Sequence, residues 1–223
     1  MSRPELAVPR LGDDVHPAYA HPRPEVTAVV PGSARRILDV GCSIGAMGAA
    51  LRARGAHVTG VEQDAELAAR AREVLDEVVE GDVEALARDG ALADAEPFDC
   101  VVFADVLEHL RDPWAVVAWG AGLVGPGGSI VLSVPNIRHA KTVLALLRRR
   151  WPYDPVGIFD RTHLRFFARR NLEDLVAGTG FSLVEVRRHH MLTVRRPQAT
   201  VNRLAPLLGD LGTLQFIARA ERR

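Results

Sequence analysis

Cysteine and lysine are scarce in this chain of 223 residues. Its two cysteines, Cys42 and Cys100, are too few for a disulfide framework or, alone, for a four-ligand zinc site. Each lies in or beside an apolar stretch, so we expect two small, buried, reduced thiols. Lys141 is the single lysine among the 28 basic residues, and all the others are arginines.

Long apolar runs are also missing. No uninterrupted apolar segment approaches the roughly 18–20 residues of a membrane-spanning helix. The residues after Met1 lack the apolar core of a secretory signal, so we expect a cytoplasmic protein with no membrane span. Hydrophobic residues nevertheless make up 48% of the chain. That content excludes a disordered protein, and the length suffices for one domain with its own core.

The zero net charge conceals two oppositely charged halves. Residues 1–112 carry 11 basic and 21 acidic side chains, whereas residues 113–223 carry 17 basic and 7 acidic ones. This split excludes a uniformly basic coat for nucleic acid and a uniformly acidic tail. It predicts that the two halves face different chemistry.

Strand-like and helix-like patterns alternate along the chain. Strands are expected at residues 36–40, 57–62, 78–81, 98–104, 129–134, 181–186 and, as a final edge strand, 214–220. Helices are expected at residues 46–54, 64–77, 83–88, 113–123, 140–150 and 169–179. This alternation predicts an α/β protein with a Rossmann-like, doubly wound, mostly parallel sheet and helices on both faces. Residues 1–24, with five prolines, are expected to be an irregular lead-in to one domain at residues 25–223.

A glycine-rich turn follows the first expected strand, in Asp39–Gly48. Gly41 and Gly45 permit a tight turn and the close approach of a ligand, although a purely structural turn is the alternative. The spacing G-x-x-x-G-x-x-G departs from the dinucleotide fingerprint G-x-G-x-x-G. A pyrophosphate cradle, and with it a nicotinamide-dependent oxidoreductase, is therefore disfavoured.

Acidic residues end the next two expected strands. Glu62 follows Asp39 by 23 residues, where doubly wound folds place an acid on the two hydroxyls of a ribose. Asp82 is suited either to the exocyclic amine of adenine or to capping the next helix. Because ligands bind beyond the carboxyl ends of such strands, these three strand ends predict a site for an adenosyl ligand.

Together these segments resemble the class I S-adenosylmethionine-dependent methyltransferases over roughly residues 19–190. The matching landmarks are residues 37–45 (ILDVGCSIG, against the family's LDVGCGxG), Glu62, Asp82, residues 98–110 and the VGPGG turn at residues 124–128. Ser43 stands where the family most often has glycine. Serine is small enough to keep the turn, so we expect cofactor binding to survive.

The resemblance implies S-adenosylmethionine as cofactor and a set of contacts for it. These are Asp39, Gly41, Cys42, Ser43 and Gly45 along the methionine moiety, Glu62 at the ribose, Gln63, Asp82 and Val83 at the adenine, and Ala104 and Asp105 on the sulfonium side. Tyr19 and Arg23 resemble a Y-x-x-x-R motif that precedes the first motif in some members. Arg23 would then pair with the cofactor carboxylate, with a surface arginine as the alternative.

Methyl transfer to an alcohol needs alignment and the removal of a proton, most simply by histidine. His163 is the first candidate for this base, with Asp160 orienting it. His109 is the second, with a structural or cofactor-pocket role as the alternative. The His189–His190 pair has no evident third ligand, so no metal site is predicted.

The resemblance implies methyl transfer to a hydroxyl, less readily an amine, of a small polar molecule. The DRTHLRFF string at residues 160–167 is similar to methyltransferases of polysaccharide and natural-product clusters, so a glycosyl group or natural-product intermediate is the expected acceptor. The class I methyltransferases insert their substrate-contacting elements after the fifth strand, so the resemblance places this insertion at about residues 136–168. Nine basic residues in the segment 138–170 suit an anionic acceptor, and a solvated basic face is the alternative.

Two other functions compete with this one. The SVPN string at residues 133–136 and Thr162–Leu164 also resemble MetW-type proteins of methionine biosynthesis. The chain would then be a non-catalytic partner of an acyltransferase that retains the cofactor fold. A nucleic-acid methyltransferase guided by the basic half is disfavoured, because the sequence has no zinc knuckle, RNA-recognition string or N-P-P-Y-type motif. The oligomeric state stays open, a homo-oligomer included.

Overall fold

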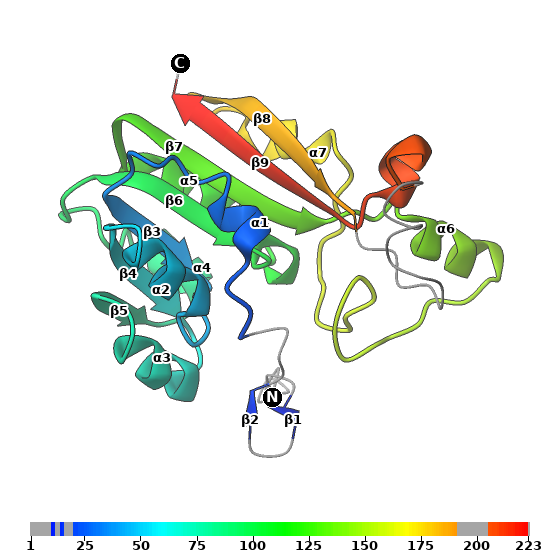
Figure 1. The fold of residues 1–223 in the computed structure, drawn as a ribbon, viewed down its shortest axis with the longest axis horizontal. Coiled ribbons are helices and arrows are strands. Elements are labelled where there is room, and N and C mark those ends of the chain that lie inside the picture. Colours follow the sequence, from blue (N-terminus) through cyan, green and yellow to red (C-terminus); the bar gives the residue numbers. More distant parts are fainter. Residues whose placement is uncertain (1–9, 12–13, 16–19, 191–204, 223) are drawn as a thin grey trace.

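The computed structural model describes residues 10–11, 14–15, 20–190 and 205–222 (Figure 1). Seven strands form one sheet in the order β5-β4-β3-β6-β7-β9-β8. They are β3 (Arg36–Val40), β4 (His57–Glu62), β5 (Glu77–Glu80), β6 (Phe98–Ala104), β7 (Val124–Pro135), β8 (Phe181–His189) and β9 (Gln215–Arg222). The first five run parallel, and β9 is antiparallel to both of its neighbours. The predicted mostly parallel, doubly wound sheet is confirmed.

Helices cover both faces of the sheet, so its strands are buried on both sides. In β6, Val101 and Phe103 belong to one apolar cluster and Cys100 and Val102 to the other, as the period of two along a strand requires. One face packs against α1 (Pro24–Thr27), α2 (Ala46–Arg52) and α3 (Ala65–Arg72). The opposite face packs against α4 (Val83–Arg88), α5 (Pro113–Leu123) and α7 (Asn171–Val176).

The two cysteines are free and buried, as expected. Cys100 is fully buried within β6, and Cys42 lies in the turn after β3. Burial raises the pKa of the Cys100 thiol to about 12. Both cysteines therefore act as small apolar side chains.

Strand β9 corrects one expectation. The last strand was predicted at the edge of the sheet, but it lies between β7 and β8 and pairs with both. Its side chains Phe216, Ala218 and Ala220 are fully buried. The edge position falls to β8, because the chain returns to the middle of the sheet after residue 190.

Several helices are shorter than their sequence patterns suggested. Helix α3 ends at Arg72, since the Asp76 carboxylate accepts a 2.8 Å hydrogen bond from the backbone of Val58 and thereby draws the chain into β5. The others are α2, which ends at Arg52, α6, which spans Ala140–Leu147, and α7. Among the described residues that precede α1, β1 (Arg10–Leu11) runs antiparallel to β2 (Asp14–Val15).

The segment between β7 and α7 lies beyond the carboxyl end of the sheet, with α6 away from the strands (Figure 1). Backbone hydrogen bonds anchor its two ends to each other, since the Ile137 N–H donates to the Phe167 carbonyl at 2.9 Å. The Asn136 amide adds bonds to the carbonyls of Asp210 and Thr213. Among the described helices none is long and apolar enough to cross a membrane.

Candidate active site

The carboxyl ends of β3, β4 and β6 meet at one edge, where the chain changes direction across the sheet. Val40 of β3 pairs with Val61 of β4 on one side and with Phe103 of β6 on the other. The predicted residues Asp39 and Glu62 therefore end neighbouring strands. This is the switch point at which open α/β sheets bind their ligands.

The glycine-rich turn after β3 adopts a left-handed backbone at three of its residues. Gly41, Ser43 and Gly45 have φ values of 77°, 51° and 78°. A Cβ at Gly41 would lie 3.1 Å from Val106, so glycine lets the turn pack closely against the segment after β6. The glycine-rich turn and the segment after β6 thus lie against each other at the carboxyl edge of the sheet.

Asp39 supplies an unusual buried charge to this region. Its side chain is 1% exposed, and neither carboxylate oxygen has a hydrogen-bond partner. Burial, with a smaller contribution from the negative Glu62, raises the pKa of Asp39 to about 7. A buried acceptor without a donor is costly, which fits a ligand carrying N–H donors and positive charge, such as the methionine end of S-adenosylmethionine.

Glu62 is held in place by the backbone around it. Its Oε2 accepts a hydrogen bond from the Ser43 N–H and its Oε1 from the Asp64 N–H, both at 2.9 Å. Burial raises the pKa of Glu62, and these bonds work in the opposite direction. Carboxylate oxygens have further lone pairs, so Glu62 can still accept from a ribose diol.

The residues predicted at the adenine occupy different surroundings. Asp82 caps α4 by accepting a 2.9 Å hydrogen bond from the Glu84 N–H. Val83 is buried and Gln63 is exposed. Tyr19 lies outside the described residues. Asp82 therefore has the capping role that the sequence left open as the alternative. It also lies just after the end of β5, where an adenine contact was predicted.

Arg23 pairs with protein carboxylates. Its guanidinium forms ion pairs with Asp105 and with Glu25, the latter at 2.6 Å, and donates to Gln215 Oε1 at 3.0 Å. Gln215 and Ser133 both donate to Asp105 Oδ1. This network ties α1 to the ends of β6, β7 and β9. If Arg23 binds the carboxylate of the cofactor, as predicted, its guanidinium has to bind that group in addition to these protein partners.

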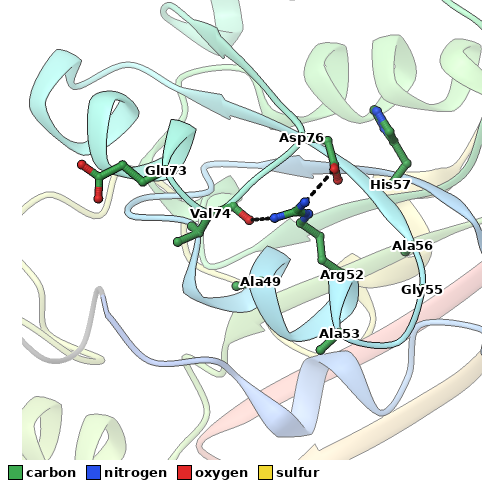
Figure 2. A pocket seen from close by; sticks show the side chains of 9 residues that line it. All are labelled: Ala49, Arg52, Ala53, Gly55, Ala56, His57, Glu73, Val74 and Asp76. Atoms are coloured by element: carbon green, nitrogen blue, oxygen red, sulfur yellow. Dashed lines mark hydrogen bonds and ion pairs between the residues drawn. The ribbon is translucent and has the colours of Figure 1, made fainter.

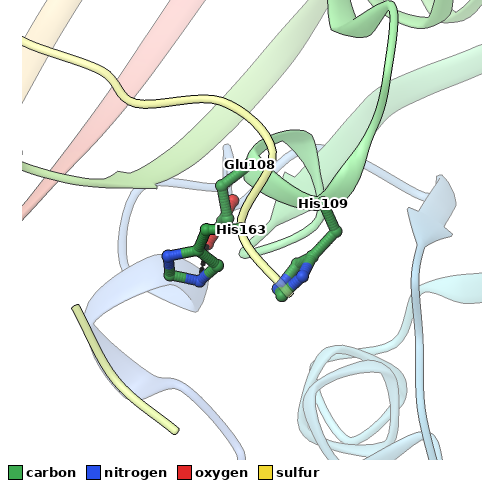
Figure 3. Close-up of side chains that lie close together, drawn as sticks. All are labelled: Glu108, His109 and His163. Atoms are coloured by element: carbon green, nitrogen blue, oxygen red, sulfur yellow. Dashed lines mark ion pairs between the residues drawn. The ribbon is translucent and has the colours of Figure 1, made fainter. Parts of the chain in front are cut away.

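Glu108, His109 and His163 meet beside this edge, and we call them the histidine cluster (Figure 3). Glu108 and His109 lie in η2 (Leu107–His109), directly after β6, and His163 comes from the segment after α6. The His163 Nε2 is 4.0 Å from Glu108 Oε1, and the two imidazole rings pack edge to face with centroids 4.8 Å apart.

Backbone hydrogen bonds bring His163 to this position. The N–H groups of Leu164 and Arg165 both donate to the Glu108 carbonyl, at 2.7 and 3.0 Å. The Arg165 guanidinium also donates to the carbonyls of Leu164 and Arg111. This arginine of the basic segment therefore serves the local structure, as does Arg138, which pairs with Asp210 at 3.6 Å.

Asp160, predicted to orient His163, is linked to His109 through Thr162, and its negative charge works to raise the pKa of both histidines. The Asp160 carboxylate accepts hydrogen bonds from the Thr162 N–H at 2.8 Å and the Thr162 hydroxyl at 2.7 Å. The same hydroxyl lies 2.8 Å from His109 Nδ1. A hydroxyl has one proton to donate, so His109 Nδ1 carries a hydrogen and its Nε2 keeps a free lone pair.

Glu108 is buried and the two histidines are largely covered, and the ionisation of the cluster reflects this. The side chains of His163 and Glu108 are 6% and 2% exposed. Burial, followed by the neighbouring His109, lowers the pKa of His163 to about 4. Burial raises the pKa of Glu108 to about 8, and its Oε2 has no hydrogen-bond partner. Burial also lowers the pKa of His109.

A separate open hollow of about 670 Å³ lies at the opposite, amino edge of the sheet (Figure 2). Arg52 extends across it, pairing with Asp76 at 2.9 Å and donating to the Val74 carbonyl. The hollow contains none of the residues predicted for cofactor or catalysis.

Comparison with known proteins agrees with this geometry. The family described as "Methyltransferase domain" matches residues 12–186. A ubiquinone biosynthesis O-methyltransferase of Burkholderia thailandensis is 33% identical over 165 residues, 72% of this chain and 69% of that protein. The corresponding enzyme of Xylella fastidiosa is 38% identical over 120 residues, 53% of this chain. That match spans about half, 49%, of the relative's length.

Solved structures share the fold at low sequence identity. A SAM-dependent methyltransferase from Archaeoglobus fulgidus superposes with a TM-score of 0.62 at 15% identity, covering 86% of this chain and 87% of that one. Magnesium protoporphyrin IX methyltransferase from Synechocystis, with bound SAH, has a TM-score of 0.58 at 16% identity, covering 84% and 74%. The chain belongs to the class I S-adenosylmethionine-dependent methyltransferases, whose cofactor is S-adenosylmethionine.

Three residues of the site were not singled out from the sequence. Glu108 was noted only within a string around His109, and Thr162 and Gln215 carried no signal of their own. Thr162 lies between two predicted residues, Asp160 and His163, in a polar string, and that was the available hint. Gln215 starts a strand that only the folded sheet places beside Asp105.

Proposed function

We propose that this protein transfers the methyl group of S-adenosylmethionine to a hydroxyl group of a small molecule, and that the histidine cluster receives that hydroxyl. The observation that carries the proposal is the position of the cluster. Its residues Glu108 and His109 follow β6 within five residues of Ala104, at the edge that also holds Asp39 and Glu62. Acceptor chemistry and cofactor residues thus meet at one edge of the sheet.

The cofactor residues fit S-adenosylmethionine in chemistry as well as place. Asp39 offers two unpartnered carboxylate oxygens to the ammonium end, Glu62 offers acceptors to the ribose hydroxyls, and the turn at Gly41 and Gly45 permits close backbone approach. When bound, the cofactor supplies an electrophilic methyl group on a sulfonium sulfur. The protein then has to orient the acceptor, exclude water and accept a proton.

The histidine cluster is suited to the acceptor's proton. Both imidazoles are neutral near pH 7, because burial lowers their pKa values. His109 is the better candidate to hold a proton, since the Thr162 hydroxyl fixes its Nδ1–H and leaves Nε2 free. The sequence favoured His163. Its lower pKa, about 4, makes it the weaker base of the two.

Oxygen is favoured over nitrogen as the methyl acceptor by the comparison with relatives. Two relatives that cover 72% and 69% of this chain are named ubiquinone biosynthesis O-methyltransferases. A hydroxyl also has more need of a buried, neutral base than an amine, because it must lose its proton during attack. Glycosyl hydroxyls, natural-product intermediates and phenols are the acceptor classes to test.

The test combines cofactor binding with turnover. Titration calorimetry with S-adenosylhomocysteine measures binding, and release of that product from S-adenosylmethionine measures turnover across a panel of sugar, phenol and amine acceptors. We expect one bound cofactor per chain and turnover with a hydroxyl acceptor that falls at least about 100-fold in His109→Ala. His57→Gln, a half-exposed histidine at the start of β4, is the matched control.

Two results would contradict the proposal. Turnover only with amines would move the reaction from oxygen to nitrogen. Tight binding of S-adenosylhomocysteine with no turnover on any acceptor, together with co-purification of an acyltransferase, would favour the non-catalytic alternative.

A further inference from the structure

We propose that the histidine cluster binds a divalent transition-metal cation. One carboxylate and two imidazoles each offer a ligand atom, and these atoms all lie within 4.8 Å of one another (Figure 3). Two histidines and one carboxylate form a ligand set that suits Zn²⁺, Mn²⁺ and Fe²⁺ better than Mg²⁺ or Ca²⁺. Among the described residues, this is the one group in which three potential metal ligands lie so close together.

Both imidazoles are already held in the state that a metal ligand needs. The Nδ1–H of His109 donates to Thr162, whose hydroxyl donates to Asp160. The ring of His163 is hydrogen-bonded to the backbone of Ile158, while its Nε2 faces Glu108. Metal-bound histidines almost always donate their second N–H to a carbonyl, carboxylate or similar acceptor. A neutral imidazole carries one N–H and one lone pair, so each ring can offer one nitrogen to a cation.

Glu108 provides an independent observation. Its side chain is 2% exposed, its Oε2 has no hydrogen-bond partner, and its Oε1 is 4.0 Å from the nearest cluster nitrogen, beyond hydrogen-bond distance. A buried carboxylate in that state is costly. A cation between Glu108 and the two imidazoles would satisfy its oxygens directly.

The spacing of the ligand atoms is close to what one ion requires. Ligands about 2.1 Å from a zinc-like ion lie roughly 3–3.5 Å from each other. The separations here, 4.0 Å for one pair and up to 4.8 Å for the set, need to contract by roughly 1 Å. We expect rotation of the Glu108 and His163 side chains to supply that contraction.

Three protein ligands leave coordination positions open for an acceptor hydroxyl. A bound cation lowers the pKa of that hydroxyl, so its O–H bond breaks with the proton passing to solvent. The oxygen then bonds to the methyl carbon while the carbon–sulfur bond breaks, giving a methyl ether and S-adenosylhomocysteine. This role rests on the proposed function and replaces His109 as the proton acceptor. The binding of the cation does not depend on it.

The test uses Co²⁺ as a spectroscopic probe on the full chain after removal of metals by chelation. We expect one equivalent to bind, with visible absorption bands characteristic of nitrogen ligation. Glu108→Gln, His109→Gln and His163→Gln should each weaken Co²⁺ binding at least about 100-fold, and His57→Gln should leave it unchanged. Zn²⁺ should displace Co²⁺ and abolish the visible bands.

The outcomes separate the cation site from the proposed function. Co²⁺ binding without methyl transfer on any acceptor would support the site and count against the function. Methyl transfer unaffected by chelation, with no Co²⁺ bands in the wild-type protein, would overturn the site and leave the function standing. The wild-type spectrum decides the question even if a substituted variant fails to fold. Co²⁺ binding that all three substitutions leave unchanged would assign the metal to another place.

Discussion

The hydroxyl of Thr162 lies between the Asp160 carboxylate, at 2.7 Å, and His109 Nδ1, at 2.8 Å. These residues come from two segments, since Thr162 and His109 are 53 positions apart. The single hydroxyl proton points to Asp160, and this fixes which nitrogen of His109 is free. Thr162 is thus a positioning residue that acts through His109.

Thr162→Val should weaken Co²⁺ binding by about 10- to 100-fold, because the imidazole loses the partner that fixes its tautomer and orientation. Thr162→Ser retains a hydroxyl and should restore most of the affinity. The shift of the Co²⁺ absorption bands in Thr162→Val is a readout that a merely structural role would not move. Equal Co²⁺ affinities for the valine and serine variants would contradict the assignment.

Asp39→Asn should stabilise the cofactor-free protein at alkaline pH. Folding raises the pKa of Asp39 to about 7, so its contribution to stability is full below the unfolded pKa of about 3.9 and is lost as the pH rises through 7. The neutral amide lacks this loss. The quantity to compare is the free energy of unfolding of the variant minus that of the wild type. We expect this difference to be up to about 4 kcal/mol larger at pH 8 than at pH 4.

Urea unfolding at the two pH values measures this difference for Asp39→Asn. The same variant should bind S-adenosylhomocysteine at least about 10-fold more weakly, because it loses a buried charged acceptor. A variant that is less stable at pH 8 than the wild type, and binds the cofactor product equally well, would show that Asp39 is satisfied in some other way.

Gly45→Ala should cost more stability than Gly55→Ala. Both glycines have positive φ, 78° and 87°, so both substitutions carry a backbone penalty of about 1 kcal/mol. A Cβ at Gly45 would lie 2.7 Å from Val74 Cγ2, whereas one at Gly55 meets nothing within 4 Å. The crowding adds about 1–3 kcal/mol at Gly45. Equal denaturant midpoints for the two variants would contradict this packing.

Ser43→Gly should raise the free energy of unfolding by up to about 1 kcal/mol. Ser43 holds a left-handed backbone, φ 51°, and its buried hydroxyl has no hydrogen-bond partner. Glycine relieves the strain, and its greater freedom in the unfolded chain offsets part of the gain. Urea unfolding checks the change. Destabilisation accompanied by weaker binding of S-adenosylhomocysteine would assign the hydroxyl to the cofactor.

The order of strands along the chain could be predicted well because local patterns determine it. Short apolar runs rich in β-branched residues, such as Val101–Phe103, favour buried strands, and Gly41 and Gly45 mark a turn that few other residues tolerate. The place of β9 could not be predicted. Its residues, apolar at 216–218 and charged at Arg219 and Glu221, suit a middle strand and an edge strand equally, and the choice depends on where β8 pairs.

The sequence by itself determined the fold class and the strand ends where Asp39 and Glu62 lie, because these follow from short-range pattern and turn chemistry. The cofactor followed from the resemblance of these segments to the methyltransferase family. Its charge division suggested a cofactor half before residue 112 and an acceptor half after it. Only the tertiary structure joined the halves, placing His163 against Glu108 and His109. Burial and tautomer arise from packing between distant segments, and no local pattern encodes the hydrogen bonds that the Glu108 carbonyl accepts from Leu164 and Arg165.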